Sequence, residues 1–177
     1  GTLSNLNALI AARNNAGLCT NPNSVLLVSE DAHSSFVKCI KVMGLDSKNL
    51  VRIKTDNQGR MNINELRKTL DKCSIENKKI FAIVATLGTT VRGAIDPIKE
   101  ISEICKQTNI WLHIDGSIGG IFALTSIPIE GLNNINQANS ITINPQKIIG
   151  ITKTSSLLLV SNMTTLENTF NTGLPYI

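Results

Sequence analysis

Six apolar runs of strand length, separated by segments with helical periodicity, constrain the fold of this chain more than any other feature. The runs occupy residues 24–29, 50–55, 80–88, 110–115, 140–144 and 155–161. Runs this continuous are typical of strands that are buried on both faces. Helical patterns occupy residues 33–43, 64–73 and 96–108. The alternation predicts an α/β fold, with a mainly parallel sheet flanked by helices on both faces.

The helical pattern at 96–108 carries its own start signal. Asp96 is expected to cap the helix and Pro97 to occupy its first position. Ile98, Ile101 and Ile104 then share one apolar face. No composition shift or long linker interrupts the pattern, so the chain is expected to form a single domain or a large piece of one.

Composition excludes several classes of protein. The 177 residues are 42% hydrophobic and 17% charged, which is ordinary for a globular domain. A net charge of +4, with one Trp, one Tyr and no basic block, argues against nucleic-acid binding. The four cysteines are scattered and predict free thiols in a reducing compartment, hence the cytoplasm. No signal peptide or membrane span is predicted.

The two ends of the sequence are not those expected of a whole protein. Gly1 opens directly into GTLSNLNALIAAR, which has the pattern of a loop entering a helix, and TGLPYI adds no closing element. Residues 1–177 are therefore expected to be part of a larger domain.

Polar residues follow several of the predicted strands. They are His33, residues 86–90, Asp115 and residues 144–147. In sheets of this type, ligands bind outside the carboxyl ends of the strands. These residues come from separate parts of the chain but are expected to meet at one edge of the sheet.

Gly1 and Thr2 stand at the predicted start of the first helix. Free backbone N–H groups and the positive end of the helix dipole make such a start suitable for a phosphate group. Taken alone the pattern is weak, and capping statistics favour Thr2 as a simple N-cap.

Asp115 and Lys147 each follow an apolar strand. A carboxylate such as Asp115 needs a cationic or hydrogen-bonded partner, and one such partner is the ring nitrogen of pyridoxal phosphate. A lysine in apolar surroundings can have a lowered pKa and act as a nucleophile toward a carbonyl, although a solvated surface lysine is the commoner case. A phosphate-binding helix start, a carboxylate partner for the ring nitrogen and a reactive lysine are together what pyridoxal phosphate requires.

The two histidines carry weaker signals. His33 alone is expected to be a surface or capping residue, or to stack on a flat cofactor if one lies at the same edge. His113 is interpreted as a structural residue. The sequence contains neither H-E-x-x-H nor a cysteine cluster, so no catalytic metal is expected, and it contains no G-x-S-x-G elbow of a hydrolase.

Five ordered motifs resemble the pyridoxal-phosphate-dependent group II amino-acid decarboxylases. They are GTLSNLNALIAAR, SEDAHSSFVKCIKVMGL, VATLGTTVRGAIDPI, WLHIDGSIGG and SITINPQKIIG. The resemblance runs over essentially the whole chain. It implies the aminotransferase-like fold type I, a homodimer, and decarboxylation of an L-amino acid to an amine and CO2.

The resemblance also implies a role for each matching residue. Lys147 forms the Schiff base, Asp115 pairs with the pyridine nitrogen, and His33 stacks on the ring and orients substrate; these three are the candidate catalytic residues. The candidate cofactor-binding residues are Gly1, Thr2, His33, Thr90, Asp115, Ser117, Asn144, Gln146 and Lys147.

Two motifs depart from the family pattern. Gln146 replaces the usual histidine before the lysine, and the usual Asp-Ala-Ala-aromatic is replaced by Asp115, Gly116, Ser117 and Ile118. Glutamine can donate a hydrogen bond but cannot shuttle a proton near neutral pH. Aromatic-substrate preference therefore cannot be assumed.

The resemblance leaves other functions open. The family's N-terminal segment, its mobile loop with a catalytic tyrosine and its small C-terminal domain are expected to lie outside these residues, and Tyr176 is not expected to be that tyrosine. The piece alone is expected to be inactive. Two alternatives stay open: another pyridoxal-phosphate reaction, such as a carbon–carbon lyase or a transaminase, and a non-catalytic, degenerate cofactor-binding fold.

Overall fold

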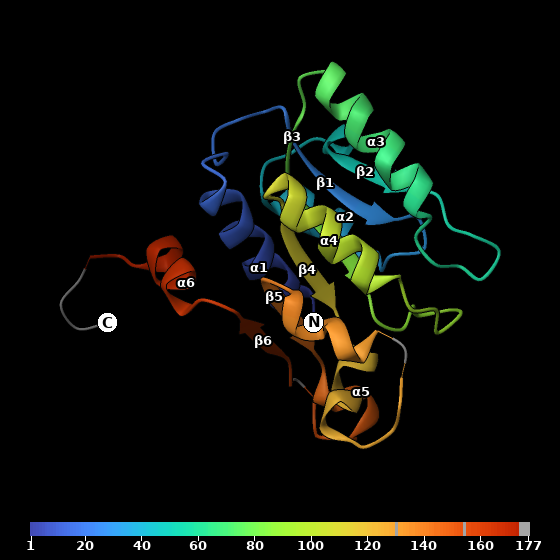
Figure 1. Cartoon of the computed structure of the whole chain (residues 1–177). Coiled ribbons are helices and arrows are strands. Elements are labelled where there is room, and N and C mark those ends of the chain that lie inside the picture. The colour runs from blue at the N-terminus through green and yellow to red at the C-terminus, as the bar shows by residue number, and fades with distance from the viewer. Residues whose placement is uncertain (130, 154, 174–177) are drawn as a thin grey trace.

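A six-stranded sheet forms the centre of the computed structural model, which describes residues 1–129, 131–153 and 155–173. The strand order is β2-β1-β3-β4-β5-β6, and only the pairing of β5 with β6 is antiparallel. The strands are β1 (Ser24–Ser29), β2 (Leu50–Ile53), β3 (Lys79–Thr86), β4 (Trp111–Asp115), β5 (Ser140–Ile143) and β6 (Leu157–Val160). The predicted mainly parallel sheet is confirmed (Figure 1).

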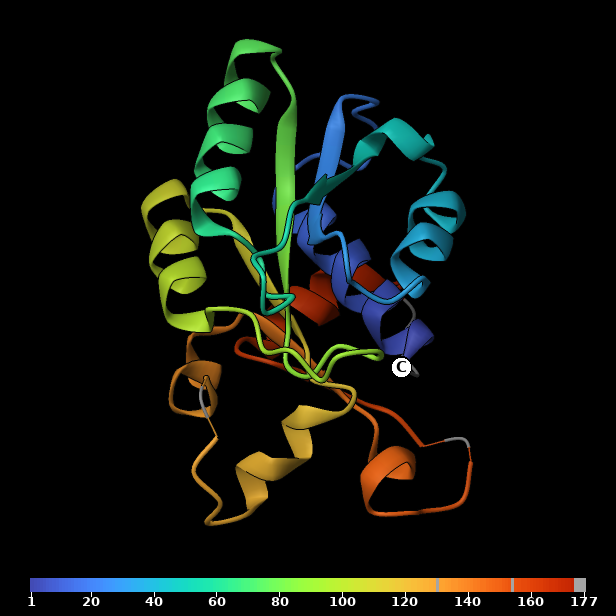
Figure 2. The same ribbon diagram turned by 90° about the vertical axis from the view of Figure 1, so that its right-hand side faces the viewer.

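Helices cover both faces of the sheet (Figure 2). On one face lie α1 (Thr2–Asn15) and α2 (Ser35–Val42), and on the other α3 (Ile63–Ile75) and α4 (Ile98–Thr108). The smaller elements are η1 (Ser47–Asn49), η2 (Gly119–Leu124), η3 (Leu132–Gln137), α5 (Pro145–Ile148) and α6 (Met163–Phe170). Two apolar cores, one on each face, result from this three-layer arrangement.

The central strands have the burial that is typical of parallel strands between two helical layers. Every residue of β1 and β4 is buried, and so are the last six residues of β3. Burying an aliphatic side chain fully contributes about 1.5–3 kcal/mol, so continuous apolar strands are most stable between two helical layers.

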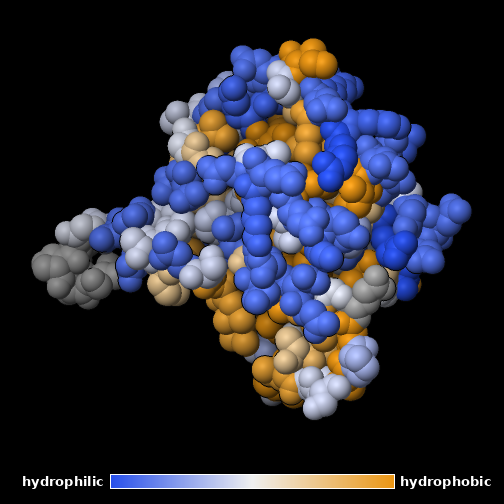
Figure 3. Space-filling view, in the orientation of Figure 1, coloured by the Kyte–Doolittle hydropathy of each residue, from blue (hydrophilic) through white to orange (hydrophobic). Residues whose placement is uncertain are grey.

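The prediction of burial on both faces is wrong for the two edge strands, β2 and β6. In β2, Leu50 and Val51 are half-buried and Arg52 is exposed. Leu157 and Leu159 are 48% and 50% exposed, and β6 lies at the sheet edge, antiparallel to β5. Its apolar side chains are therefore not part of either core. Exposed apolar residues also gather around η2 and α5, at the lower end of the view in Figure 3, and include Leu124, Ile127, Ile148, Ile149 and Ile151.

Asp96 does not cap α4, contrary to the prediction. The cap position is Pro97, and the helix begins at Ile98. Asp96 is 1% exposed, and its two carboxylate oxygens accept hydrogen bonds from the backbone N–H groups of Met61 (2.6 Å) and Thr86 (2.7 Å). It therefore ties the segment before α3 to the end of β3, next to the edge where the polar residues meet.

None of the helices in the described part of the chain is long and apolar enough to cross a membrane. All four cysteines are free thiols, and burial raises the pKa of Cys39 to about 11 and that of Cys105 to about 12. Buried thiols of this kind behave as small apolar side chains.

The burial of Asp96 predicts a pH-dependent contribution to stability. Desolvation raises the pKa of its carboxyl from 3.8 to about 6. Between these pH values the folded chain holds a proton that the unfolded chain has lost, so this contribution falls as the pH rises from about 4 to 6, by about 3 kcal/mol. Urea unfolding of wild type and Asp96→Asn from pH 4 to 7.5 should show their difference in unfolding free energy changing with that slope. Parallel curves would contradict the prediction.

Candidate active site

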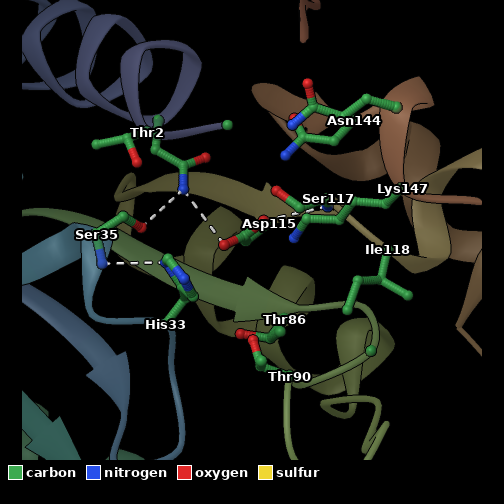
Figure 4. Close-up of a pocket in the computed structure, with 14 residues that line it drawn as sticks. Thr2, His33, Ser35, Thr86, Thr90, Asp115, Ser117, Ile118, Asn144 and Lys147 are labelled. Carbon is green, nitrogen blue, oxygen red and sulfur yellow. Dashed lines mark hydrogen bonds between the residues drawn. The ribbon is translucent and has the colours of Figure 1, made fainter. Parts of the chain in front are cut away.

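One pocket of about 180 Å³ lies at the carboxyl edge of the parallel strands (Figure 4). It brings together all nine residues predicted to bind the cofactor, which are Gly1, Thr2, His33, Thr90, Asp115, Ser117, Asn144, Gln146 and Lys147. The meeting of the residues that follow the strands was expected, and Gly1 and Thr2, at the start of α1, join them. The role of each residue stays a prediction. Asn5 and Ser35 also line the pocket and were not singled out from the sequence, and Ile118, noted there as a departure from the family pattern, lines it as well.

The ends of three parallel strands build the floor of the pocket. Thr86 ends β3 and pairs with Asp115 at the end of β4. Asn144 directly follows β5, and Lys147 lies in the one-turn helix α5 that comes next. Side chains separated by tens of residues therefore face the same space (Figure 4).

Asp115 is 4% exposed, and both of its carboxylate oxygens are engaged. Oδ1 accepts a hydrogen bond from the backbone N–H of Ser117 at 3.1 Å, and Oδ2 accepts one from Nδ2 of Asn5 at 3.3 Å. These two donors orient the carboxylate toward the pocket, where it can receive a further cationic or N–H partner.

The turn after Asp115 explains the glycines of WLHIDGSIGG. The N–H of Gly119 donates to the carbonyl of Leu87 at 2.9 Å, and a Cβ at Gly119 would lie 2.5 Å from that carbonyl oxygen. A side chain there would force the turn away from the end of β3. Ile118 occupies the pocket wall where the family pattern has an aromatic residue.

His113 is fully buried, as expected for a structural histidine. Its Nδ1 lies 2.8 Å from Oγ of Ser140 and its Nε2 lies 3.1 Å from Oδ1 of Asn5. Desolvation lowers the pKa of the imidazole to about 4, with Asp115 acting in the opposite direction. The ring is therefore neutral at physiological pH.

Gly1 occupies the cap position of α1, and no side chain caps this helix. The favoured reading of Thr2 as an N-cap is therefore wrong, because Thr2 is the first helical residue. A Cβ at Gly1 would lie 2.6 Å from Nδ2 of Asn144 and 3.3 Å from Oγ of Ser117. Close approach of the backbone to these polar groups leaves the N–H groups of the first helical turn beside the pocket.

Asn144 is held from outside the pocket. Its Oδ1 accepts a hydrogen bond from Oγ of Ser156 at 2.7 Å, and Ser156 also contacts Oγ of Ser4 at 2.7 Å. With Oδ1 engaged in this way, the Nδ2 donor of Asn144 faces Gly1. Ser4 and Ser156 gave no sequence signal, since isolated serines are too common to single out.

Lys147 lies at the pocket but not in apolar surroundings. It is an exposed residue, and the neighbouring Ile148 and Ile149 are 49% and 54% exposed. The expected apolar environment of the lysine is therefore not formed by the described residues. Gln146 anchors the same turn, because its Oε1 accepts a hydrogen bond from the backbone N–H of Ser155 at 3.0 Å.

His33 lies at the pocket mouth and is exposed. Its Nδ1 accepts a hydrogen bond from the backbone N–H of Ser35, at 3.1 Å, at the start of α2. Ser34 occupies the cap position of α2, so His33 precedes the cap. Its ring still faces the pocket (Figure 4). Tyr176 lies outside the described residues.

The donor set of the pocket fits pyridoxal phosphate. The first turn of α1 and the Nδ2 group of Asn144 can receive the phosphate, and Asp115 can receive a protonated ring nitrogen. Thr86 Oγ1 is buried with no hydrogen-bond partner in the structure, which leaves a polar group at the pocket for a ligand. No group of three or more potential metal ligands occurs among the described residues.

The sheet order, with a carboxylate at the end of β4 and a lysine after β5, is the arrangement expected of a fold type I large domain. Residues 2–177 match the family described as "Pyridoxal-dependent decarboxylase conserved domain". The chain belongs to this family of amino-acid decarboxylases.

Relatives in the family act on different substrates by name. The chain is 32% identical to the aromatic-L-amino-acid decarboxylase of Bacillus atrophaeus over all of its length, and 34% identical to the human acidic amino acid decarboxylase GADL1 over 84% of its length. It spans 37% and 30% of these two proteins, respectively.

Solved structures agree with the family assignment. The crystal structure of mouse CSAD superposes with a TM-score of 0.89 at 29% identity, covering 96% of this chain and 37% of that one. The tryptophan decarboxylase of Catharanthus roseus, in complex with L-tryptophan, superposes with a TM-score of 0.89 at 26% identity, covering 98% and 38%.

Burial of neutral His113 predicts a second pH effect, opposite in sign to that of Asp96. Its pKa falls from 6.5 to about 4 on folding. Below pH 6.5 the unfolded chain binds a proton that the folded chain refuses, so this contribution is lost as the pH falls from 6.5 toward 4, by about 3 kcal/mol. The unfolding free energy of wild type relative to His113→Gln should fall over this range. A difference that does not vary with pH would refute the prediction.

Proposed function

We propose that the intact protein to which this chain belongs decarboxylates an L-amino acid to an amine and CO2, with pyridoxal phosphate bound in the pocket. The observation that carries the proposal is the meeting of Asp115, Lys147 and the start of α1 at one pocket, in a chain that belongs to a decarboxylase family. The chain spans well under half of its relatives, so the activity is proposed for the whole protein.

Bound pyridoxal phosphate supplies the electron sink that accepts the pair of electrons left when CO2 departs. We propose that residues of this chain hold the cofactor, orient it and keep its ring nitrogen protonated. We propose that Lys147 is the Schiff-base lysine, since it is the lysine that lines the pocket. Its exposed position on α5 leaves its amine free to reach across the pocket.

Asp115 keeps the ring nitrogen protonated in this proposal. It is nearly buried and its oxygens are oriented by Ser117 and Asn5, so its charge acts in a region of reduced dielectric constant. His33 would lie against the ring, because its Nδ1 is occupied by the N–H of Ser35 and its ring faces the pocket.

Gln146 stands where the family pattern has a histidine, and this replacement is the reason to compare decarboxylation with other pyridoxal-phosphate reactions. Its side-chain oxygen accepts a hydrogen bond from the backbone N–H of Ser155, so the residue holds the turn that carries the lysine.

Analysis of the reaction products separates the candidate reactions. Amine with equimolar CO2 as the products supports decarboxylation. A keto acid would instead support a transaminase, and carbon–carbon cleavage a lyase.

The location and the assembly of the protein form the last part of the proposal. We propose a cytoplasmic location, on the strength of four free cysteines, and a homodimer, on the strength of the family resemblance. Light scattering of the intact protein measures its mass in solution; a monomer at assay concentration would overturn the second proposal.

Substitution of Lys147 tests the proposed attachment. After incubation with pyridoxal phosphate, wild type should develop an absorbance band that borohydride converts to a stable adduct on Lys147, and Lys147→Ala should show neither. Mass spectrometry of proteolytic peptides locates the adduct. Lys153, an exposed lysine near the same turn, provides the control Lys153→Ala, which should retain the adduct. An adduct on a different lysine, or none, would refute the assignment.

Substitution of Asp115 tests the ring-nitrogen partner. Asp115→Asn keeps the shape of the side chain but removes its charge, so kcat should fall by roughly 10²–10³ while the borohydride-trapped adduct still forms. Release of CO2 from a panel of acidic and aromatic L-amino acids measures the rate and selects the substrate. Wild-type kcat in this variant would rule out an electrostatic role for Asp115.

A further inference from the structure

We infer that Asn5 and His113 are positioning residues for the carboxylate of Asp115. They form the middle of a buried series of four hydrogen bonds that begins at Trp111 and ends at Asp115, each donated in the direction of Asp115. The inference rests on the proposed function, in which Asp115 is the partner of the cofactor's ring nitrogen. It adds the residues that orient the carboxylate of Asp115.

Four hydrogen bonds make up the chain. Nε1 of Trp111 lies 2.8 Å from Oγ of Ser140, which lies 2.8 Å from Nδ1 of His113. Nε2 of His113 lies 3.1 Å from Oδ1 of Asn5, whose Nδ2 lies 3.3 Å from Oδ2 of Asp115. Asn5 and Ser140 are each 1% exposed and His113 is 0% exposed, so solvent does not compete for these groups.

The chemistry of the two ends sets the direction of the chain. An indole N–H can only donate, and a carboxylate can only accept. The amide of Asn5 must therefore turn its NH2 end to Asp115 and its oxygen to His113, which requires a proton on Nε2 of the ring. A neutral ring then accepts at Nδ1, so the hydroxyl of Ser140 donates to it while receiving the indole N–H.

Every N–H group of the Asn5 amide and of the His113 ring has an acceptor in this arrangement. The second hydrogen of the Asn5 amide reaches Oγ of Ser35 at 3.3 Å, so both of its N–H groups are used. The neutral form of His113 agrees with the lowering of its pKa by burial. Asp115 is the charged group that faces the ring, and its acceptor oxygen is reached through Asn5 instead of directly.

The series of hydrogen bonds links three elements, β4, β5 and α1, behind the pocket. Trp111, His113 and Asp115 alternate along β4 and share the face toward α1, Ser140 is the register partner of His113 on β5, and Asn5 comes from α1. Aligned hydrogen bonds polarise one another in a region of low dielectric constant. Their positive ends all point at Asp115, which favours its negative charge and fixes its direction.

Nitrogen-15 NMR of the intact protein without cofactor tests the donor-to-acceptor direction of these hydrogen bonds. With labelled histidine, His113 should be neutral at pH 7 with its proton on Nε2, and its signal is assigned by its loss in His113→Gln. A proton on Nδ1, or a doubly protonated ring, would overturn the inference whatever the variants below do.

Asn5→Leu tests the effect on the site, and Asn49→Leu is the matched control. Asn49 is also a buried asparagine (3% exposed) whose Nδ2 donates two hydrogen bonds, to the carbonyls of Pro22 and Ser24, but it lies at the opposite end of β1 from the pocket. Both variants should lower the unfolding midpoint. Only Asn5→Leu should raise the dissociation constant of pyridoxal phosphate, by about tenfold.

The ring nitrogen of the cofactor provides a readout that a general loss of stability does not change. In protein loaded with 15N-labelled pyridoxal phosphate, wild type and Asn49→Leu should keep this nitrogen protonated from pH 6 to 8, whereas Asn5→Leu should lose the proton within that range. If wild type yields no borohydride-trapped adduct, the proposed function falls. If wild type does and Asn5→Leu matches Asn49→Leu in both readouts, the function stands and the inference falls.

Discussion

Burial of the parallel strands on both faces is the constraint on which the rest of this structure depends. A strand covered by helices above and below is built mainly from apolar side chains, and a polar side chain inside it, such as His113, needs buried hydrogen-bond partners. Because five strands run the same way, their carboxyl ends lie at one edge, and the polar residues that follow them meet there. The position of the pocket thus follows from the burial of the sheet between two helical layers and from the common direction of its strands.

A polar site at the edge of an apolar sheet requires that its buried groups be satisfied. Asp96 and Asp115, both nearly inaccessible, show two solutions. Asp96 uses two backbone N–H groups and serves the fold, joining the segment before α3 to β3. Asp115 uses one backbone N–H and one side-chain amide and keeps a free direction toward the pocket, as a functional carboxylate must.

Much of this arrangement could be predicted from the sequence, because it follows from local patterns. Apolar runs located all six strands, and the residues after them located the pocket. Other features depend on tertiary contacts. The exposure of β6 and of Lys147 depends on what covers them, the role of Asp96 on a partner 35 residues away, and that of Asn5 on a residue 110 positions later. An asparagine in the first turn of a helix carries no signal of such a partner.

The two sides of the pocket differ in how firmly they are held, and this difference matches the chemistry proposed for them. Asp115 ends a central strand and is fixed by neighbours on α1 and in its own turn. Lys147 lies on a single turn of helix, exposed, with the hydrogen bond of Gln146 to Ser155 holding that turn. A partner for a ring nitrogen must stay in one place to stabilise charge without reorganisation, whereas an amine that bonds to and leaves a carbonyl carbon must move. Rigidity at the carboxylate and freedom at the lysine therefore belong to the same mechanism.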